Sequence, residues 1–145
     1  MDLFTAMDTS SSALSAERTR MHLISSNLAN VNTTRTPEGG PYKRKDAVFT
    51  ATPAADGFGR VLDGAAGTHV RQVRVTEILE DKSPARMQYD PTHPDADPQG
   101  YVAMPNVNVV EEMADMITAT RVYEANVMSA QAAKNMALKT LEIGK

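Results

Sequence analysis

The sequence predicts a mainly α protein with long N- and C-terminal helices paired in a coiled-coil-like layer and with a small β- and turn-rich middle region. All eight prolines and seven of the eight glycines lie between Pro37 and Pro105, so the helix breakers are confined to the middle. Both flanks carry apolar residues at heptad-like spacing. We therefore divide the chain into an N-terminal helix (1–36), a middle region with short antiparallel strands (37–105) and a C-terminal helix that pairs with the first (106–145).

The N-terminal segment carries an amphipathic stripe. Its main row repeats every seven residues and consists of Met7, Leu14, Met21 and Leu28. A companion row holds Leu3, Ile24 and Val31, but Ser10 and Glu17 interrupt it, which weakens the early half of the stripe. The run DTSSS offers good capping residues. The helix is thus expected to begin either near Asp2 or only near Ser12.

Three asparagines stand where this first helix should end. Asn tolerates the left-handed conformation of a helix cap, and we expect Asn32 to terminate the helix in this way. Asn27 lies more than a turn earlier, where Asn is not a strong helix former. Amides beside an apolar seam can set the register between packed helices. We favour such a packing role for Asn27 and Asn30, with plain surface exposure as the alternative.

The C-terminal segment predicts one long helix. Asn108 followed by Glu111 is similar to a capping box, and no Gly or Pro occurs from Val109 to Ile143. At 1.5 Å per residue such a helix reaches roughly 50 Å. Its heptad-like stripe consists of Val109, Met113, Met116, Tyr123, Val127, Ala130, Ala137 and Leu141. Further apolar residues lie off this stripe, at Val110, Ile117, Met128 and Leu138, so we expect the helix to contact several neighbours.

The middle region reads as short strands joined by turns. HVRQVRVTEIL (69–79) alternates polar and apolar residues, as an exposed strand does. RMQYD (86–90) and YVAM (101–104) are predicted as further strands, and the stretch 51–67 is predicted as a flexible loop. We expect a small antiparallel β element.

Composition excludes several classes of function. The net charge of -3 and the pI near 5.6 argue against a nucleic-acid partner, and we interpret Arg18, Arg20 and the 43–45 basic cluster as solvated surface. The absence of cysteine excludes disulfides, thiolate metal sites and cysteine nucleophiles. No apolar run is long enough to span a bilayer. The first residues lack the features of a cleaved signal peptide.

The acidic stretch YDPTHPDADPQGY (89–101) is the main candidate for metal chemistry. Asp90, His93, Asp95 and Asp97 are possible ligands, but the calcium-loop template fails because its closing position is Asn106 and Pro98 lies inside. We favour a stiff connector whose Asp side chains make local turn bonds. No nucleophile–base pattern and no phosphate-binding motif is present. We expect no enzyme activity, no cofactor and no small-molecule substrate.

Two motifs carry a resemblance to a known family. SSNLANVNT followed by PYKRK resembles the N-terminal signature of the flagellar rod and hook-type axial proteins, and YDPTHPDADPQGYVAMPNVNVVEEMADMITATRVYEANV (89–127) closely resembles the C-terminal half of its proximal-rod branch. The insertion TRTPEGG lengthens the family's usual turn, which disfavours the distal-rod and hook branches. The stretch 52–69 carries no usable resemblance.

The resemblance implies a structural subunit of the bacterial flagellar basal body. Such subunits are exported without a cleaved signal, assemble into the rod that crosses the periplasm, and transmit torque for motility. Implied partners are further copies, other rod proteins, and the MS ring or export-gate side of the basal body. The expected assembly interface comprises Met7, Leu14, Met21, Asn27, Leu28, Asn30, Val31, Met113, Met116, Tyr123, Val127 and Leu141. Competing interpretations are a soluble helical adaptor or export chaperone of the same shape, and a metal-dependent enzyme.

Overall fold

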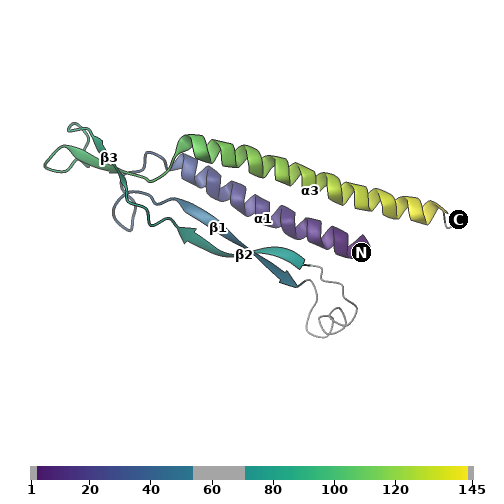
Figure 1. Cartoon of the computed structure of the whole chain (residues 1–145). Coiled ribbons are helices and arrows are strands. Elements are labelled where there is room, and N and C mark those ends of the chain that lie inside the picture. The colour runs from purple at the N-terminus through teal and green to yellow at the C-terminus, as the bar shows by residue number, and fades with distance from the viewer. Residues whose placement is uncertain (1–2, 54–70, 144–145) are drawn as a thin grey trace.

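The computed structural model describes residues 3–53 and 71–143, and it forms an elongated molecule in three layers (Figure 1). Helix α1 (Leu3–Ala29) is the central layer. Helix α3 (Val109–Ile143) packs antiparallel along one side of it. A hairpin of β1 (Lys45–Pro53) and β2 (Arg71–Glu80) packs against the other side. A second, smaller hairpin joins β3 (Arg86–Tyr89) to β4 (Tyr101–Met104). The structure has two long helices and small antiparallel sheets in the middle of the chain, and to this extent it confirms the predicted mainly α class.

Helix α1 begins at Leu3, the earlier of the two predicted starts. Its companion row is the buried one, because Ser10, Glu17 and Ile24 are all buried. The main row is less covered: Met7 is exposed and Met21 is only half-buried. Ser10 and Glu17 were expected to interrupt the packed row of the first helix, but both are buried in it. These two residues lie inside the contact, since α1 is covered on two sides.

The end of α1 does not use a left-handed cap. The positive backbone φ angles found in the described residues belong only to glycines, so the prediction for Asn32 is wrong. Asn30 acts instead: its Nδ2 donates to the Ser26 carbonyl at 2.9 Å, and its Oδ1 accepts from the Thr33 hydroxyl at 3.1 Å. The side chain thus adds bonds to the last turn of the helix, where the Ser26 carbonyl also accepts from the Asn30 backbone amide at 3.1 Å.

Helix α3 runs from Val109 to Ile143, inside the predicted C-terminal helix segment, and Asn108 caps its start. The Asn108 side-chain oxygen accepts from the Val110 amide at 3.1 Å, and its carbonyl accepts from the Glu112 amide at 3.0 Å. Within the described part of the chain, no returning bond from Glu111 completes a capping box. The most deeply buried positions are Glu112, Ala119 and Ala133, because alanines allow α1 to approach closely. The predicted stripe lies beside this line, and its members Val109, Met113 and Leu141 are exposed.

The larger hairpin pairs Lys45 with Glu80 and Pro53 with Arg71, with a bulge at Val48/Phe49. Strand β4 coincides with the predicted one, and β3 ends one residue before its predicted end. Strand β2 covers most of the stretch predicted over 69–79, of which 69–70 lie outside the described residues. Strand β1 was not predicted, because it starts in the basic cluster and its end, 51–53, falls in the stretch interpreted as a loop. The rest of that loop lies in 54–70, outside the described residues. The hairpin is tied to α1 where the Val73 amide donates to the Ser12 hydroxyl at 3.2 Å.

The acidic connector between β3 and β4 is held by its own side chains. Asp90 accepts from the Thr92 hydroxyl at 2.7 Å and from the Thr92 amide at 3.1 Å, and these two bonds lower the pKa of Asp90. Asp97 accepts from the amides of Gln99 and Tyr101. The predicted local turn bonds are confirmed. No group of three or more His, Asp or Glu side chains placed to hold a metal occurs among the residues that the structure describes.

Gly100 closes this connector, and we expect Gly100→Ala to destabilise the protein more than Gly39→Ala. Both glycines have a left-handed φ, +85° and +91° respectively, which costs an L-residue about 1–2 kcal/mol. Only at Gly100 would a Cβ also meet the Tyr89 ring, at 2.9 Å. Urea unfolding of both variants measures the difference. Equal losses of stability would show that contact with the Tyr89 ring is unimportant.

Candidate functional site: a polar cluster and two exposed helix surfaces

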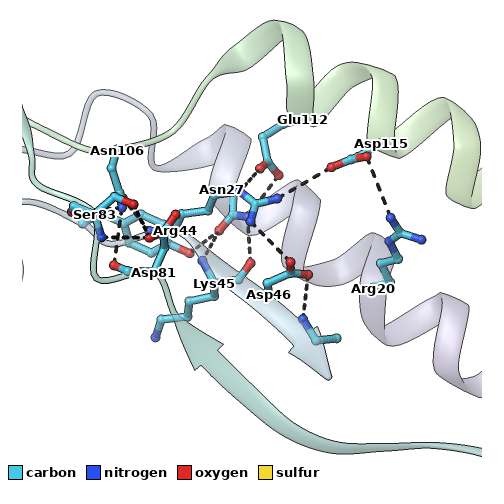
Figure 2. Close-up of polar contacts among 12 residues, drawn as sticks. Arg20, Asn27, Arg44, Lys45, Asp46, Asp81, Ser83, Asn106, Glu112 and Asp115 are labelled. Atoms are coloured by element: carbon cyan, nitrogen blue, oxygen red, sulfur yellow. Dashed lines mark hydrogen bonds and ion pairs between the residues drawn. The ribbon is translucent and has the colours of Figure 1, made fainter. Parts of the chain in front are cut away.

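A cluster of polar side chains joins three segments that are distant in sequence (Figure 2). It lies where the end of α1, the start of β1 and the start of α3 meet. We call it the polar cluster, and its central residues are Asn27, Tyr42, Arg44, Lys45 and Glu112. It fixes the register between the two helices and attaches the middle region to both of them.

Asn27 is fully buried, and its amide is satisfied on both sides. Its Nδ2 donates to the Lys45 carbonyl at 2.9 Å and to Glu112 Oε2 at 3.0 Å. Its Oδ1 accepts from the Lys45 amide and from the Tyr42 hydroxyl, both at 3.0 Å. One side chain thus pairs with a strand backbone in the manner of a neighbouring strand while it also binds a residue of the facing helix. The predicted packing role of Asn27 is confirmed within the chain, whereas Asn30 bonds only locally.

Glu112 and Arg44 form the charged part of the polar cluster. Glu112 is fully buried, and its Oε1 accepts from Arg44 Nε at 2.6 Å. Burial of the Arg44 side chain acts to lower the pKa of Arg44, but the hydrogen bond and the charge of Glu112, aided by Asp46, outweigh it and raise that pKa. A buried carboxylate requires such a partner, because an unpaired buried charge is costly.

More exposed ion pairs extend the polar cluster along the helices. Arg44 also lies 3.6 Å from Asp115, and Asp115 lies 3.8 Å from Arg20 of α1. These outer pairs are partly exposed, so each contributes little on its own. Their position matters more, since they place α1, the cluster and α3 in one connected network (Figure 2).

The strand ends are attached to the same region by Asn106. The Arg44 amide donates to Asn106 Oδ1 at 2.9 Å, and Asn106 Nδ2 lies 3.4 Å from the carbonyls of both Asp81 and Ser83. The Asp81 amide in turn donates to the Arg44 carbonyl at 2.8 Å. Asn106 therefore ties the segment before α3 to the ends of the β1–β2 hairpin.

Sequence reasoning missed much of the polar cluster. The interpretation of the basic cluster as solvated surface is wrong for Arg44, which pairs with Glu112, although it holds for the exposed Lys43. Tyr42, Glu112 and Asp115 carried no pattern that singled them out. Glu112 lies in the heptad row that also holds Ala119, Asn126 and Ala133, and this mixed row gave no sign of a buried charge.

The predicted interface residues fall into three groups in the structure. Asn27 belongs to the polar cluster. Several side chains lie half-buried along the helix pair or at its ends: Leu14, Met21, Leu28, Asn30, Val31, Met116, Tyr123 and Val127. Met7, Met113 and Leu141 are exposed. The chain itself thus covers part of the predicted interface and leaves the rest open.

The side of α3 that faces away from α1 carries exposed apolar side chains. We call this set the outer face of α3; it consists of Val110, Met113, Ile117 and Met128, whose side chains are 76%, 54%, 56% and 63% exposed. At 3.6 residues per turn these four residues share one side of the helix, opposite the buried line of Glu112, Ala119 and Ala133. No helix in the described part of the chain is long and apolar enough to cross a membrane.

Comparison with known proteins places both helical ends in flagellar families. Residues 7–35 match the family model described as flagella basal body rod protein. Residues 99–143 match the model described as flagellar basal body rod FlgEFG protein C-terminal. The two matches cover most of α1, all of α3, and both helical residues of the polar cluster, Asn27 and Glu112.

Relatives match over the whole chain. The flagellar basal-body rod protein FlgC of Borreliella burgdorferi is 45% identical, with 99% of this chain and 98% of the relative covered. FlgC of Bacillus subtilis is 43% identical and FlgC of Salmonella typhimurium is 38% identical, each over the full length of both chains. These matches confirm the resemblance and do not support the adaptor, chaperone or enzyme interpretations. The chain belongs to the FlgC family of flagellar basal-body rod proteins, which are structural subunits and not enzymes.

Proposed function

We propose that the chain is built into the flagellar rod together with further copies and other rod proteins, through the apolar surfaces that its own fold leaves open. The outer face of α3 is the observation that carries this proposal. Contiguous exposed apolar surface on a soluble chain is typical of protein–protein contacts. In the rod, neighbouring subunits cover this face.

The accessible surface of the chain supports the same conclusion. It measures 10273 Å², whereas a compact monomer of 15.7 kDa exposes roughly 7,300 Å². The elongated shape and the thin layers contribute to this excess (Figure 1). Large exposed helical and hairpin surfaces suit a subunit that is surrounded by neighbours.

The helix pair forms a coiled-coil-like layer in this proposal. The buried line of α1 at Ser10, Glu17 and Ile24 and the buried line of α3 at Glu112, Ala119 and Ala133 both advance in multiples of seven residues, as a supercoiled seam does. Of the predicted interface residues, the exposed Met7, Met113 and Leu141 serve contacts between subunits. The half-buried ones serve the helix pair and its edges.

Further features of the proposal rest on the family resemblance. The chain is exported without a cleaved signal peptide, lies in the periplasmic part of the basal body, and transmits torque as part of the proximal rod. Its partners include the MS ring or export-gate side of the structure. A rigid helix pair locked by the polar cluster is a suitable element for carrying torque, because relative sliding of the helices would break buried hydrogen bonds.

We expect Ile117→Asp to abolish rod incorporation and motility while the chain is still made and folded. The substitution places a charge at the centre of the outer face of α3, where burial against a neighbour would cost several kcal/mol. The matched control is Thr118→Asp, which adds the same charge at an exposed position rotated about 100° around the helix. Swarming and the presence of the chain in purified basal bodies measure the outcome. Normal motility with Ile117→Asp would remove this face from the assembly.

A further inference from the structure

The β1–β2 hairpin is attached firmly to the helices where β1 starts and β2 ends. There the amide and the carbonyl of Lys45 both bond to the buried Asn27 side chain, at 3.0 and 2.9 Å. The neighbouring Arg44 pairs with Glu112, and the Asp81 amide donates to the Arg44 carbonyl at 2.8 Å. The polar cluster thus fixes this end of the hairpin to both helices.

The hairpin then runs alongside α1, to which few polar contacts join it (Figure 1). The Val73 amide donates to the Ser12 hydroxyl at 3.2 Å, and no other hydrogen bond links residues 8–25 of α1 to the described strands of the hairpin. No ion pair joins these same parts of the chain, since the ion pairs of the hairpin connect Lys45 to Glu80 and Asp46 to Arg44. Beyond the polar cluster, the hairpin therefore depends on side-chain packing against α1.

That packing is interrupted by a hollow between α1 and β2. The hollow has a volume of about 500 Å³, and Val73 and Val75 line its β2 side. Of the six α1 residues that line it, five are polar and Ala16 is the exception. Short hydroxyl side chains such as Ser11 and Ser15 do not fill the space, and side chains beside a void lose the dispersion contacts that packed side chains make. The valines of β2 thus lack a matching apolar surface on α1.

A β-bulge lies between the fixed end of the hairpin and the part over the hollow. The pairing register shifts between Val48 and Phe49, and Phe49 is already paired with Val75 of the hollow. A bulge disrupts the ladder locally and bends the strand. We call the part beyond the bulge, 49–53 paired with 71–75, the arm, and the part before it, 45–48 paired with 77–80, the root.

We propose that the arm swings about the bulge and opens or closes the hollow, while the root stays fixed in the polar cluster. The swing gives up the one hydrogen bond to Ser12, whose partners water can replace, and it leaves the bonds of Asn27 and Arg44 intact. This inference rests on the proposed rod function and deepens it. A subunit that meets both further copies and other rod proteins meets surfaces of different shape, and a movable arm lets one chain fit each of them without disturbing the helix pair.

Distance measurement by pulsed electron paramagnetic resonance tests the swing, and the chain suits it because it has no cysteine of its own. His22→Cys places one nitroxide label on α1. Ala51→Cys places the second label on the arm, and Glu77→Cys places it on the root instead; all three positions are exposed. We expect the 22–51 distance distribution to be about twice as broad as the 22–77 distribution, because the swing moves the arm and not the root. Circular dichroism verifies that each labelled full-length chain is folded.

Filling the hollow separates the swing from the freedom of the labels themselves. Ser15 lines the hollow, and Ser15→Met adds an apolar side chain that adapts to irregular space. It should narrow the 22–51 distribution to about the width of the 22–77 distribution, because the arm then gains packing contacts. The matched control Ser25→Met adds the same side chain at an exposed α1 position outside the hollow, and it should leave both distributions unchanged.

Two results would overturn the swing of the arm. One is equal widths of the two distributions in the parent chain, and the other is equal effects of the two Met variants. Either result leaves the rod function intact, since the function is tested separately by incorporation of Ile117→Asp.

Discussion

Arg44→Met is expected to destabilise the chain by about 3 kcal/mol or more, because it leaves a buried carboxylate without its cation. Glu112 is fully buried, and the bond from Arg44 Nε to its Oε1 is the shortest contact of the polar cluster, at 2.6 Å. Met keeps much of the arginine stem and its packing while removing the charge. The loss of stability therefore reports on the ion pair rather than on a cavity. Urea unfolding followed by circular dichroism measures it.

Two control variants test whether the loss of stability in Arg44→Met comes from the unpaired Glu112 carboxylate. Lys43→Met removes a neighbouring charge from an exposed side chain, and it should change stability by no more than about 0.5 kcal/mol. Adding Glu112→Gln to Arg44→Met should recover part of the loss, because a neutral amide replaces the buried charge and still accepts from Asn27. If the double variant is as unstable as Arg44→Met, the cost does not come from the unpaired carboxylate.

Asn27→Leu should be comparably severe, with a loss of about 3 kcal/mol or more. Leu has nearly the same shape but leaves the Lys45 amide, the Lys45 carbonyl and the Tyr42 hydroxyl without the partner they have in Asn27. Each buried polar group left unpaired costs roughly 1–3 kcal/mol. Glu112 loses its second donor as well. Hydrogen exchange should show faster opening of the Lys45 amide and of the first turns of α3.

Asn30→Leu is the matched control for Asn27→Leu. Asn30 is half-buried and bonds only to Ser26 and Thr33, which are within four residues of it. Removal of these end-of-helix bonds should cost about 1 kcal/mol. Similar losses for the two asparagines would mean that the bonds of Asn27 to β1 and α3 do not hold the three segments together.

Local sequence determined the helices and most of the strands. The confinement of Gly and Pro to the middle and the cap at Asn108 were sufficient to place α3 at Val109–Ile143. Period-two alternation placed β2, and turn residues bounded β3 and β4. These features depend on neighbours a few residues apart, and such interactions are visible in a linear pattern. The family was also recognisable, because its two motifs are long runs of consecutive residues.

Tertiary structure alone decided which side of each helix is buried and what the polar residues do. Heptad counting favoured large apolar residues for the seam of α3, yet the buried line runs through Glu112, Ala119 and Ala133. Close approach of α1 selects small side chains there and leaves Met113 and Ile117 on the open side. Arg44 was indistinguishable in sequence from its solvated neighbours. Its partner lies 68 residues away, and only the folding of β1 between the helix ends brings the two charges into contact.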